Sequence, residues 1–367
     1  MIIGVAGLGT MGLGIVQTYA QAGFSVLATD AHGPARDSAL ARLAAALAPR
    51  VAKGAMTDEA RDALLARVAV IDNTDQFIPA ALIIEAIVER LDAKQALFAA
   101  LAAAAPEAVL ATNTSSIPVH QIAAGLARPE RLLGLHFFNP APVMKLVELI
   151  GPAGCDPQAL ALARQVTEAA GKTVINAPDR PGFIVNRCAR PFYGEALALL
   201  EEGRSPGEID AAMQAAGYRL GPFALIDLIG ADINLAATEG LSAAMGGHPR
   251  YHVFAALRAQ VAAGALGAKT GRGFTFKGEA APVPPDAASI VARIEAALVN
   301  EACWLLSEGG VTRDGIDTAL KLGLNFPRGP FGMLDHHGAA TIRATLAALE
   351  AATSLKGRYA PAPELAA

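Results

Sequence analysis

Cysteine is scarce in this sequence, and its scarcity excludes two kinds of structure. Among 367 residues there are only three cysteines, Cys155, Cys188 and Cys303. They lie far apart, with neither the spacing of a metal site nor that of a disulfide framework. Free thiols in a reducing compartment are the expected state of such residues. We therefore predict no disulfide and no metal centre.

Long stretches of one charge and long apolar runs are also missing. The net charge is -4 and no long basic block occurs, which argues against nucleic acid as the main partner. No apolar run approaches the roughly 18 residues of a membrane span, so we expect no membrane partner. The sequence opens with the strand-like segment Met1–Val5 where a signal peptide would stand, which predicts a cytoplasmic protein.

The first half of the chain alternates short apolar runs with longer helical patterns. Runs such as Leu82–Ile84 are apolar without alternation, which is typical of strands buried on both faces. Strands that alternate with helices pair in parallel through βαβ crossovers. We predict an α/β fold with a Rossmann-type parallel sheet domain at residues 1–177. The expected strands are Ile2–Ala6, Ser25–Asp30, Val68–Ile71, Leu82–Ala86, Val109–Thr112, Leu132–His136, Leu146–Ile150 and Thr173–Ile175. The expected helices include Met11–Ala22, Pro34–Lys53, Asp58–Ala66, Asp92–Ala104 and Pro157–Ala170.

After a turn-rich break at Ala177–Gly182 the pattern is almost entirely helical, and it contains an internal repeat. Matching landmarks run from Glu195 to Asp227 in the first copy and from Glu301 to Asp335 in the second. Their offset drifts only from 106 (301−195) to 108 (335−227), which indicates duplication. We predict two tandem all-α domains, at residues 178–279 and 284–355, and a disordered tail at 356–367.

A glycine motif follows the first strand and opens the first helix. The segment Gly7-Leu8-Gly9-Thr10-Met11-Gly12 fits G-x-G-x-x-G in the context that a dinucleotide site requires. The first glycine permits the tight turn, the second lets backbone approach a pyrophosphate, and the third lets helix and strand pack closely. The helix N-terminus offers N–H groups to the phosphates. We predict that Gly7, Gly9, Thr10, Met11 and Gly12 contact a dinucleotide.

The residue at the end of the second strand indicates which dinucleotide. Asp30 lies 18 residues after Gly12 (30−12), where a carboxylate can bind the ribose hydroxyls and would repel a 2′-phosphate. No Arg or Lys follows immediately. The predicted cofactor is NAD rather than NADP.

Polar residues gather between positions 113 and 148. Asn113–Ser116 follows a predicted strand at its carboxyl end, where open parallel sheets bind ligands. His136 ends another strand, and Glu148 lies inside the apolar run Leu146–Ile150. A carboxylate in such a strand needs a partner, and histidine is the obvious one. A His–Glu pair fixes the imidazole tautomer, and the imidazole can take a hydroxyl proton while hydride leaves for a nicotinamide. A structural core histidine is the alternative.

Three segments resemble those of the L-3-hydroxyacyl-CoA dehydrogenases, a family that includes the bacterial 3-hydroxybutyryl-CoA dehydrogenases. They are Asn113–Ser116, Gly134–Glu148 and Pro181–Arg187. The resemblance covers residues 1 to about 277, and the later repeat matches the family's C-terminal domain. It implies reversible oxidation of (S)-3-hydroxyacyl-CoA to 3-oxoacyl-CoA with NAD.

The resemblance also implies roles for single residues. His136 is similar to the family's catalytic base and Glu148 to its partner. Ser115 resembles the hydroxyl that binds the substrate oxygen near the nicotinamide, and Asn186 resembles the amide that places substrate against the base. Lys53 resembles a basic position that contacts a coenzyme A phosphate. The positions similar to those that touch the dinucleotide are Asn113, Glu89, Lys94, Asn139 and Lys269. Each of the charged ones could equally be a solvated surface group.

The second copy departs from the first at one important position. Ala292 stands opposite Asn186 at the offset of 106 (292−186), so we expect the second copy to be structural. The family usually forms dimers through its helical domain. The chain is therefore expected to form either a homodimer or an intrachain pseudo-dimer of helical domains.

Two other functions remain open. A free hydroxy-acid dehydrogenase of the same fold, of the L-gulonate type, would share the architecture, but Phe137–Pro140 is similar to the acyl-CoA type. A non-catalytic NAD-binding protein would not need Ser115, His136, Glu148 and Asn186 together. The residues leave acyl chain length open, since one methylene changes binding by only about 1–3 kcal/mol.

Overall fold

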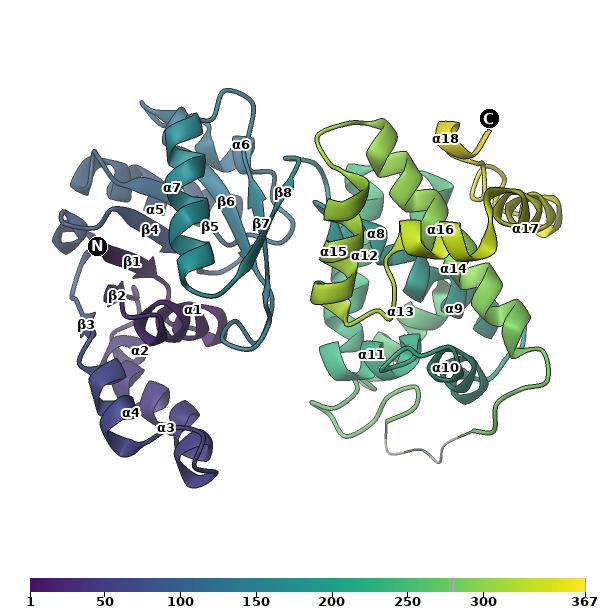
Figure 1. Cartoon of the computed structure of the whole chain (residues 1–367), viewed down its shortest axis with the longest axis horizontal. Coiled ribbons are helices and arrows are strands. Elements are labelled where there is room, and N and C mark those ends of the chain that lie inside the picture. The colour runs from purple at the N-terminus through teal and green to yellow at the C-terminus, as the bar shows by residue number, and fades with distance from the viewer. Residues whose placement is uncertain (277, 279–280, 367) are drawn as a thin grey trace. The chain divides into compact units, whose positions relative to one another are not determined.

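The chain forms two compact units, Met1–Arg180 and Pro181–Ala367, in a computed structural model that describes residues 1–276, 278 and 281–366 (Figure 1). The first unit is an α/β domain and the second is helical. This confirms the predicted fold class. The boundary lies three residues beyond the predicted end of the first domain at 177 (180−177).

An eight-stranded sheet forms the centre of the first unit, in the order β3-β2-β1-β4-β5-β6-β7-β8. The residues of β4, β5, β6 and β7 are all buried, as their largely apolar sequences predict. The strands are β1 Ile2–Ala6, β2 Ser25–Thr29, β3 Val68–Val70, β4 Leu82–Glu85, β5 Val109–Thr112, β6 Leu132–Phe137, β7 Leu146–Ile150 and β8 Thr173–Ala177. All eight predicted strands are present, each within two residues of its expected bounds.

One strand pairing differs from the predicted parallel sheet. β6 and β7 are antiparallel, with Gly134 opposite Ile150 and Phe137 opposite Val147. Only eight residues join them (146−137−1), and a parallel crossover needs a dozen or more. All other neighbouring strands are parallel.

Helices surround the sheet, and Figure 1 shows α7 lying across one face of it. They are α1 Thr10–Gln21, α2 Gly33–Asp37, α3 Ala39–Ala52, α4 Asp58–Leu65, α5 Leu91–Ala104, α6 Val119–Ala123 and α7 Pro157–Ala169, with short 3-10 turns η1 Thr74–Phe77 and η2 Pro129–Arg131. The helix expected at Pro34–Lys53 is divided at Ser38. The Ser38 hydroxyl donates a hydrogen bond of 2.7 Å to the carbonyl of Pro34. Such a side-chain bond offers the backbone an alternative to continuous helix.

The second unit consists of helices in which the predicted repeat is visible. Its elements are α8 Val185–Cys188, α9 Arg190–Glu201, α10 Pro206–Ala215, α11 Pro222–Ile229, α12 Ala231–Ala244, η3 Pro249–Tyr251, α13 Ala255–Ala262, α14 Ala287–Ser307, α15 Arg313–Leu324, α16 Pro330–His337, α17 Ala339–Ala352 and α18 Pro363–Ala366. The order α10, α11, α12 recurs as α15, α16, α17. In the first copy Asp210 accepts hydrogen bonds from two N–H groups at the start of α11, and in the second Asp317 does the same for α16.

A buried carboxylate of the second copy is paired with cationic side chains of the first copy. Glu301 on α14 is 1% exposed. Its oxygens accept hydrogen bonds from Arg187 Nε at 2.7 Å, Arg250 Nε at 3.1 Å and the Tyr251 hydroxyl at 2.6 Å. The second copy thus compensates cations that the first copy buries.

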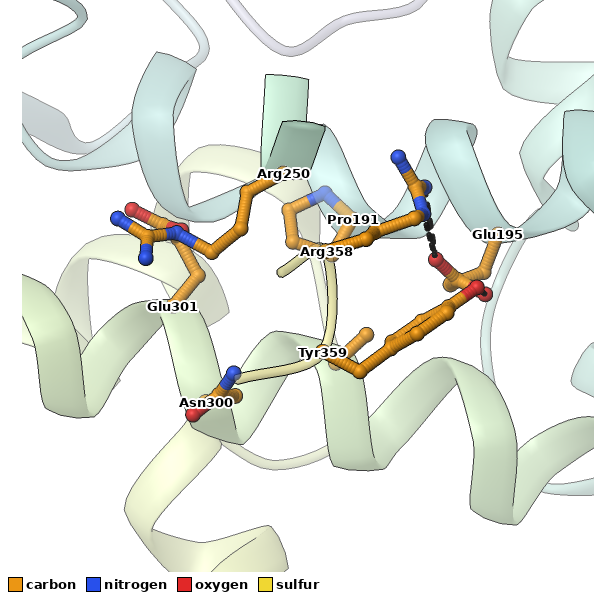
Figure 2. Close-up of a pocket in the computed structure, with 8 residues that line it drawn as sticks. Pro191, Glu195, Arg250, Asn300, Glu301, Arg358 and Tyr359 are labelled. Atoms are coloured by element: carbon orange, nitrogen blue, oxygen red, sulfur yellow. Dashed lines mark hydrogen bonds and ion pairs between the residues drawn. The ribbon is translucent and has the colours of Figure 1, made fainter. Parts of the chain in front are cut away.

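The same arrangement occurs with the two copies exchanged, since a buried carboxylate of the first copy is contacted by side chains of the second. Glu195 on α9 is also 1% exposed. It accepts hydrogen bonds from Arg293 Nε at 2.8 Å, Arg358 Nη2 at 2.7 Å and the Tyr359 hydroxyl at 2.8 Å. Figure 2 shows the Arg358 guanidinium and the Tyr359 hydroxyl directed at this carboxylate. Each partner is displaced by 106 to 108 residues from its counterpart around Glu301 (293−187, 358−250, 359−251). The copies are therefore joined by reciprocal contacts.

The expected disordered tail is instead packed in the part that the structure describes. Tyr359, Ala362 and Leu365 are at most 3% exposed. The Asn300 side chain donates to Ala360 O at 2.9 Å and accepts from Ala362 N at 2.8 Å. The tail is ordered because it supplies the partners of Glu195. The second copy therefore continues beyond the predicted end at 355, whereas the predicted end of the first copy at 279 lies outside the described residues.

Candidate functional site

The glycine motif forms the turn between β1 and α1, and its three glycines meet different demands. Gly7 has φ +104, and a Cβ there would lie 2.4 Å from Ala86 O. A Cβ on Gly12 would lie 1.8 Å from Gly7 O, so this position permits the close packing of turn and helix. A Cβ on Gly9 would meet nothing within 4 Å. Gly7 and Gly12 are therefore required by close contacts with the protein's own backbone. Gly9 instead leaves open space for a ligand to approach.

Asp30 is held beside this turn by main-chain donors. Its Oδ2 accepts from Leu8 N at 2.7 Å and its Oδ1 from His32 N at 2.8 Å. The carboxylate is therefore fixed at the end of β2, where a dinucleotide ribose would lie. Arg36 Nη1 donates to the carbonyl oxygen of Asp30 at 2.6 Å. Sequence reasoning from the residues directly after Asp30 missed this arginine, which the turn brings back to the strand end.

His136 and Glu148 stand directly opposite each other on β6 and β7. The His136 Nδ1 and Glu148 Oε2 atoms are 2.6 Å apart. His136 is 6% exposed and Glu148 is fully buried. A carboxylate that accepts from Nδ1–H selects the tautomer in which Nε2 carries the lone pair. The pair is therefore arranged to hold a basic Nε2 and to stabilise the imidazolium that protonation would form.

Glu89 organises the loop that carries Ser115. Its Oε1 accepts from Thr114 Oγ1 at 2.7 Å, Ser115 N at 2.9 Å, Ser116 N at 3.1 Å and Ser116 Oγ at 2.9 Å. Its Oε2 lies 3.2 Å from Lys94 Nζ. Burial raises the pKa of Glu89, but the Lys94 charge and these hydrogen bonds outweigh burial and lower the pKa below its usual value. A fixed anion thus orders the loop and leaves Ser115 exposed.

A second buried ion pair supports this arrangement. Lys94 is 1% exposed, and its Nζ donates to Glu85 Oε1 at 2.6 Å. Glu85, fully buried at the end of β4, also accepts from Thr112 Oγ1 and Ile87 N, each at 2.7 Å. Sequence reasoning missed Glu85, although a carboxylate ending an apolar run is the same signal that singled out Glu148. Contact of Lys94 with a dinucleotide stays a prediction.

The two predicted asparagines of this unit lie near the carboxyl ends of the central strands. Asn113 Oδ1 accepts from Phe137 N at 2.8 Å, which ties the end of β5 to that of β6. Asn139 is exposed after β6, and its peptide bond to Pro140 is cis. Lys172, which sequence reasoning also missed, donates to Met144 O at 2.8 Å and so holds the connection between β6 and β7.

The other predicted residues lie elsewhere in each unit. Lys53 caps the end of α3 and is exposed. Within the helical unit, Asn186 lies on α8, half-buried. Lys269 of the same unit forms an ion pair with Asp232 at 2.5 Å.

The described residues hold no group of three or more His, Cys, Asp or Glu side chains that could bind a metal ion. The thiols of Cys155, Cys188 and Cys303 are free. No helix in the described part of the chain is both long and apolar enough to cross a membrane.

Comparison with known proteins identifies both units. Residues 2–180 match the 3-hydroxyacyl-CoA dehydrogenase NAD binding domain, and residues 182–276 and 290–366 match the C-terminal domain of the same enzyme. The 3-hydroxyadipyl-CoA dehydrogenase of Escherichia coli (strain K12) is 42% identical over 274 residues, which are 74% of this chain and 58% of that protein. The probable 3-hydroxybutyryl-CoA dehydrogenase of Bacillus subtilis (strain 168) is 39% identical over 273 residues, 74% of this chain and 95% of that protein.

Solved structures agree. The crystal structure of 3-hydroxybutyryl-CoA dehydrogenase from Escherichia coli K12 has a TM-score of 0.93 at 32% identity, covering 100% of this chain and 97% of that one. Two separate segments of the chain match the C-terminal domain, which is what the predicted duplication leads us to expect. NAD is confirmed as the cofactor of the first unit. The chain therefore belongs to the 3-hydroxyacyl-CoA dehydrogenase family, whose members are NAD-dependent oxidoreductases.

Proposed function

We propose that this protein catalyses the reversible oxidation of (S)-3-hydroxyacyl-CoA to 3-oxoacyl-CoA with NAD, and that His136 is the general base. The buried contact of 2.6 Å between His136 Nδ1 and Glu148 Oε2 carries the proposal. Relatives named for 3-hydroxyacyl-CoA substrates support it.

The residues present fit the dinucleotide. Gly9 leaves space for the pyrophosphate and Asp30 offers a fixed carboxylate to the ribose. When bound, NAD supplies the hydride acceptor. The Nε2 atom of His136 accepts the proton of the substrate hydroxyl, and Glu148 stabilises the resulting imidazolium. The return of that proton serves the reverse reaction.

Other residues position the substrate. Ser115, on the loop ordered by Glu89, donates its hydroxyl to the oxygen on the reacting carbon, and Asn186 places the acyl group. We assign Asn113, Asn139, Lys94 and Lys269 to the surroundings of the dinucleotide. Lys53 is assigned to a phosphate of coenzyme A.

The test is the variant His136→Gln, assayed with acetoacetyl-CoA and NADH by following NADH absorbance. Loss of a general base should lower kcat by on the order of 100-fold or more. His120→Gln is the matched control, because His120 is exposed and contacts Asp179 at the start of α6. Turnover of His136→Gln near that of the control would refute the assignment of the base.

The same assay separates the two alternative functions. Free acetoacetate with NADH, or gulonate with NAD, would be the better substrate pair for a free hydroxy-acid dehydrogenase than the CoA ester. NADH binding without turnover of any acyl-CoA would indicate a non-catalytic protein.

We further propose that the second helical copy forms a pseudo-dimer with the first inside one chain, rather than a homodimer of two chains. The reciprocal contacts of Glu195 and Glu301 support this, because each copy compensates the buried cations of the other. The three free thiols support a reducing compartment, for which we propose the cytoplasm.

A further inference from the structure

The two helical copies differ systematically at one place in their cores. Four positions that are polar in the first copy are apolar in the second, at offsets of 106 for the α9 region and 108 for α12. These offsets also relate the reciprocal partners of Glu195 and Glu301. The pairs, with the first copy given first, are Asn186 and Ala292, Arg190 and Ala296, Asn234 and Ile342, and Thr238 and Leu346.

The second copy shows that packing does not require these polar groups. Ala296 is fully buried, and Ile342 and Leu346 are each 1% exposed. Helices α12 and α17, which carry the last two pairs, both span 14 residues and both follow a glycine with positive φ. The same helix arrangement is thus stable with an apolar interior. Retaining polar groups in the first copy costs desolvation, which calls for another reason.

The side-chain amide of Asn234 in the first copy lacks hydrogen-bond partners among the described residues. It is 2% exposed, and within the described part of the chain neither its Nδ2 nor its Oδ1 has a hydrogen-bond partner. Buried side-chain amides are hydrogen-bonded in the large majority of proteins. An amide with neither group satisfied indicates that something binds there.

Arg190 brings a positive charge to the same place. It is 8% exposed, and its guanidinium donates to Asn186 O at 3.0 Å, Asn234 O at 3.5 Å and Thr238 Oγ1 at 3.1 Å. It also lies over the Tyr193 ring, 4.9 Å from the centroid. None of these contacts among the described residues is an anion, and burial lowers the pKa of Arg190.

The other buried arginines of this unit make the contrast clear. Arg187 and Arg358, and likewise the half-buried Arg293, each contact one or two carboxylates at 2.6 to 3.2 Å. A buried guanidinium is costly without such compensation. Arg190 and Asn234 together offer fork-like N–H donors, which match the geometry of a carboxylate.

We propose that Arg190 and Asn234 bind the free carboxylate at the far end of a dicarboxylic 3-hydroxyacyl group. This rests on the proposed function, in which Asn186 places the acyl group. Arg190 begins α9, four residues after Asn186 on α8, and its Nε donates to the Asn186 carbonyl. The anion closest to Asn186 in such a substrate is the acyl carboxylate, since the coenzyme A phosphates lie at the opposite end of the molecule. Arg190 and Asn234 thereby select dicarboxylic over monocarboxylic substrates.

The experiment compares 3-oxoadipyl-CoA with 3-oxohexanoyl-CoA, which has the same carbon chain but ends in a methyl group. Arg190→Ala and Asn234→Ile introduce the residues that the second copy already holds at these positions. We expect the wild-type protein to prefer 3-oxoadipyl-CoA with NADH. Arg190→Ala should reduce the ratio of the two kcat/KM values on the order of 10- to 100-fold, because a hydrogen-bonded charge pair is lost. Asn234→Ile should reduce the ratio to a smaller extent.

Controls separate the explanations. Arg258→Ala removes an exposed arginine that pairs with Glu239 and should leave the ratio as in the wild type. Thermal melts verify folding, and Arg190→Lys keeps the charge if Arg190→Ala does not fold. Equal losses on both substrates, as expected if Arg190 bound a coenzyme A phosphate or only supported Asn186, would overturn the proposal. A wild-type ratio near one would also overturn it. Turnover of neither ester would instead refute the proposed function.

Discussion

Removing the charge of Glu301 tests how the two helical copies hold together. Glu301→Gln keeps the shape of the side chain but takes the carboxylate from Arg187 and Arg250. Arg187 is fully buried and retains Glu308, at 2.7 and 2.6 Å, whereas Arg250 keeps, among the described residues, only ring contacts such as the one with Trp304. Breaking a buried ion pair by removing one partner costs about 3–5 kcal/mol. That is a large part of the roughly 5–15 kcal/mol that stabilises a native protein.

Urea unfolding followed by circular dichroism would measure the free energy of unfolding. Because Glu195 repeats the contacts of Glu301 in the other copy, Glu195→Gln should cost a similar amount. The control is Glu202→Gln at the C-terminal end of α9, since the Glu202 side chain is 56% exposed, and its loss should cost about 1 kcal/mol or less. A cost below about 1 kcal/mol for Glu301→Gln, or equal costs for Glu195→Gln and Glu202→Gln, would refute the reasoning.

Two further predictions concern the cofactor turn and the helical core. Gly9→Ala should raise the KM for NADH with little change in Tm. Gly12→Ala should lower the free energy of unfolding by about 1–3 kcal/mol, because its Cβ would overlap Gly7 O. A reversed pattern would contradict the roles given to these glycines. Burial raises the pKa of Asp210 to about 6 from 3.8, so the folded state holds this proton more tightly than the unfolded state. The stability of the wild type relative to Asp210→Asn should therefore fall as pH rises from about 4 to 6, by up to about 3 kcal/mol, and a flat difference in urea titrations would contradict it.

Local patterns were enough to predict most of the first unit. The short apolar runs predicted all eight strands, because strands buried on both faces read as largely apolar segments. The glycine motif and Asp30 predicted the dinucleotide site, since a turn, its helix and the next strand lie close in sequence. The repeat could also be read directly, because matching landmarks recur at a nearly constant offset.

Pairings between distant residues could not be read in this way. The sequence predicted that Glu148 needs a partner and named His136, but only the antiparallel pairing of β6 and β7 placed the two residues directly opposite each other. Glu89 and Lys94 were expected to touch the dinucleotide, which stays a prediction, and only the fold shows what they contact within the protein, namely the Ser115 loop and Glu85. The local sequence around a charged residue does not indicate which distant residue it contacts.

The sequence by itself therefore determined the strands, the cofactor turn, the duplication and the residue types of the candidate site, since each depends on spacing along the chain. Only the tertiary structure decided which buried charges are compensated. It ordered the tail by giving Arg358 and Tyr359 a buried carboxylate in Glu195. It also showed that Arg190 contacts no carboxylate among the described residues and that the Asn234 amide has no partner there. Burial and compensation of charge depend on contacts between segments about 40 to 160 residues apart, which spacing in the sequence does not encode.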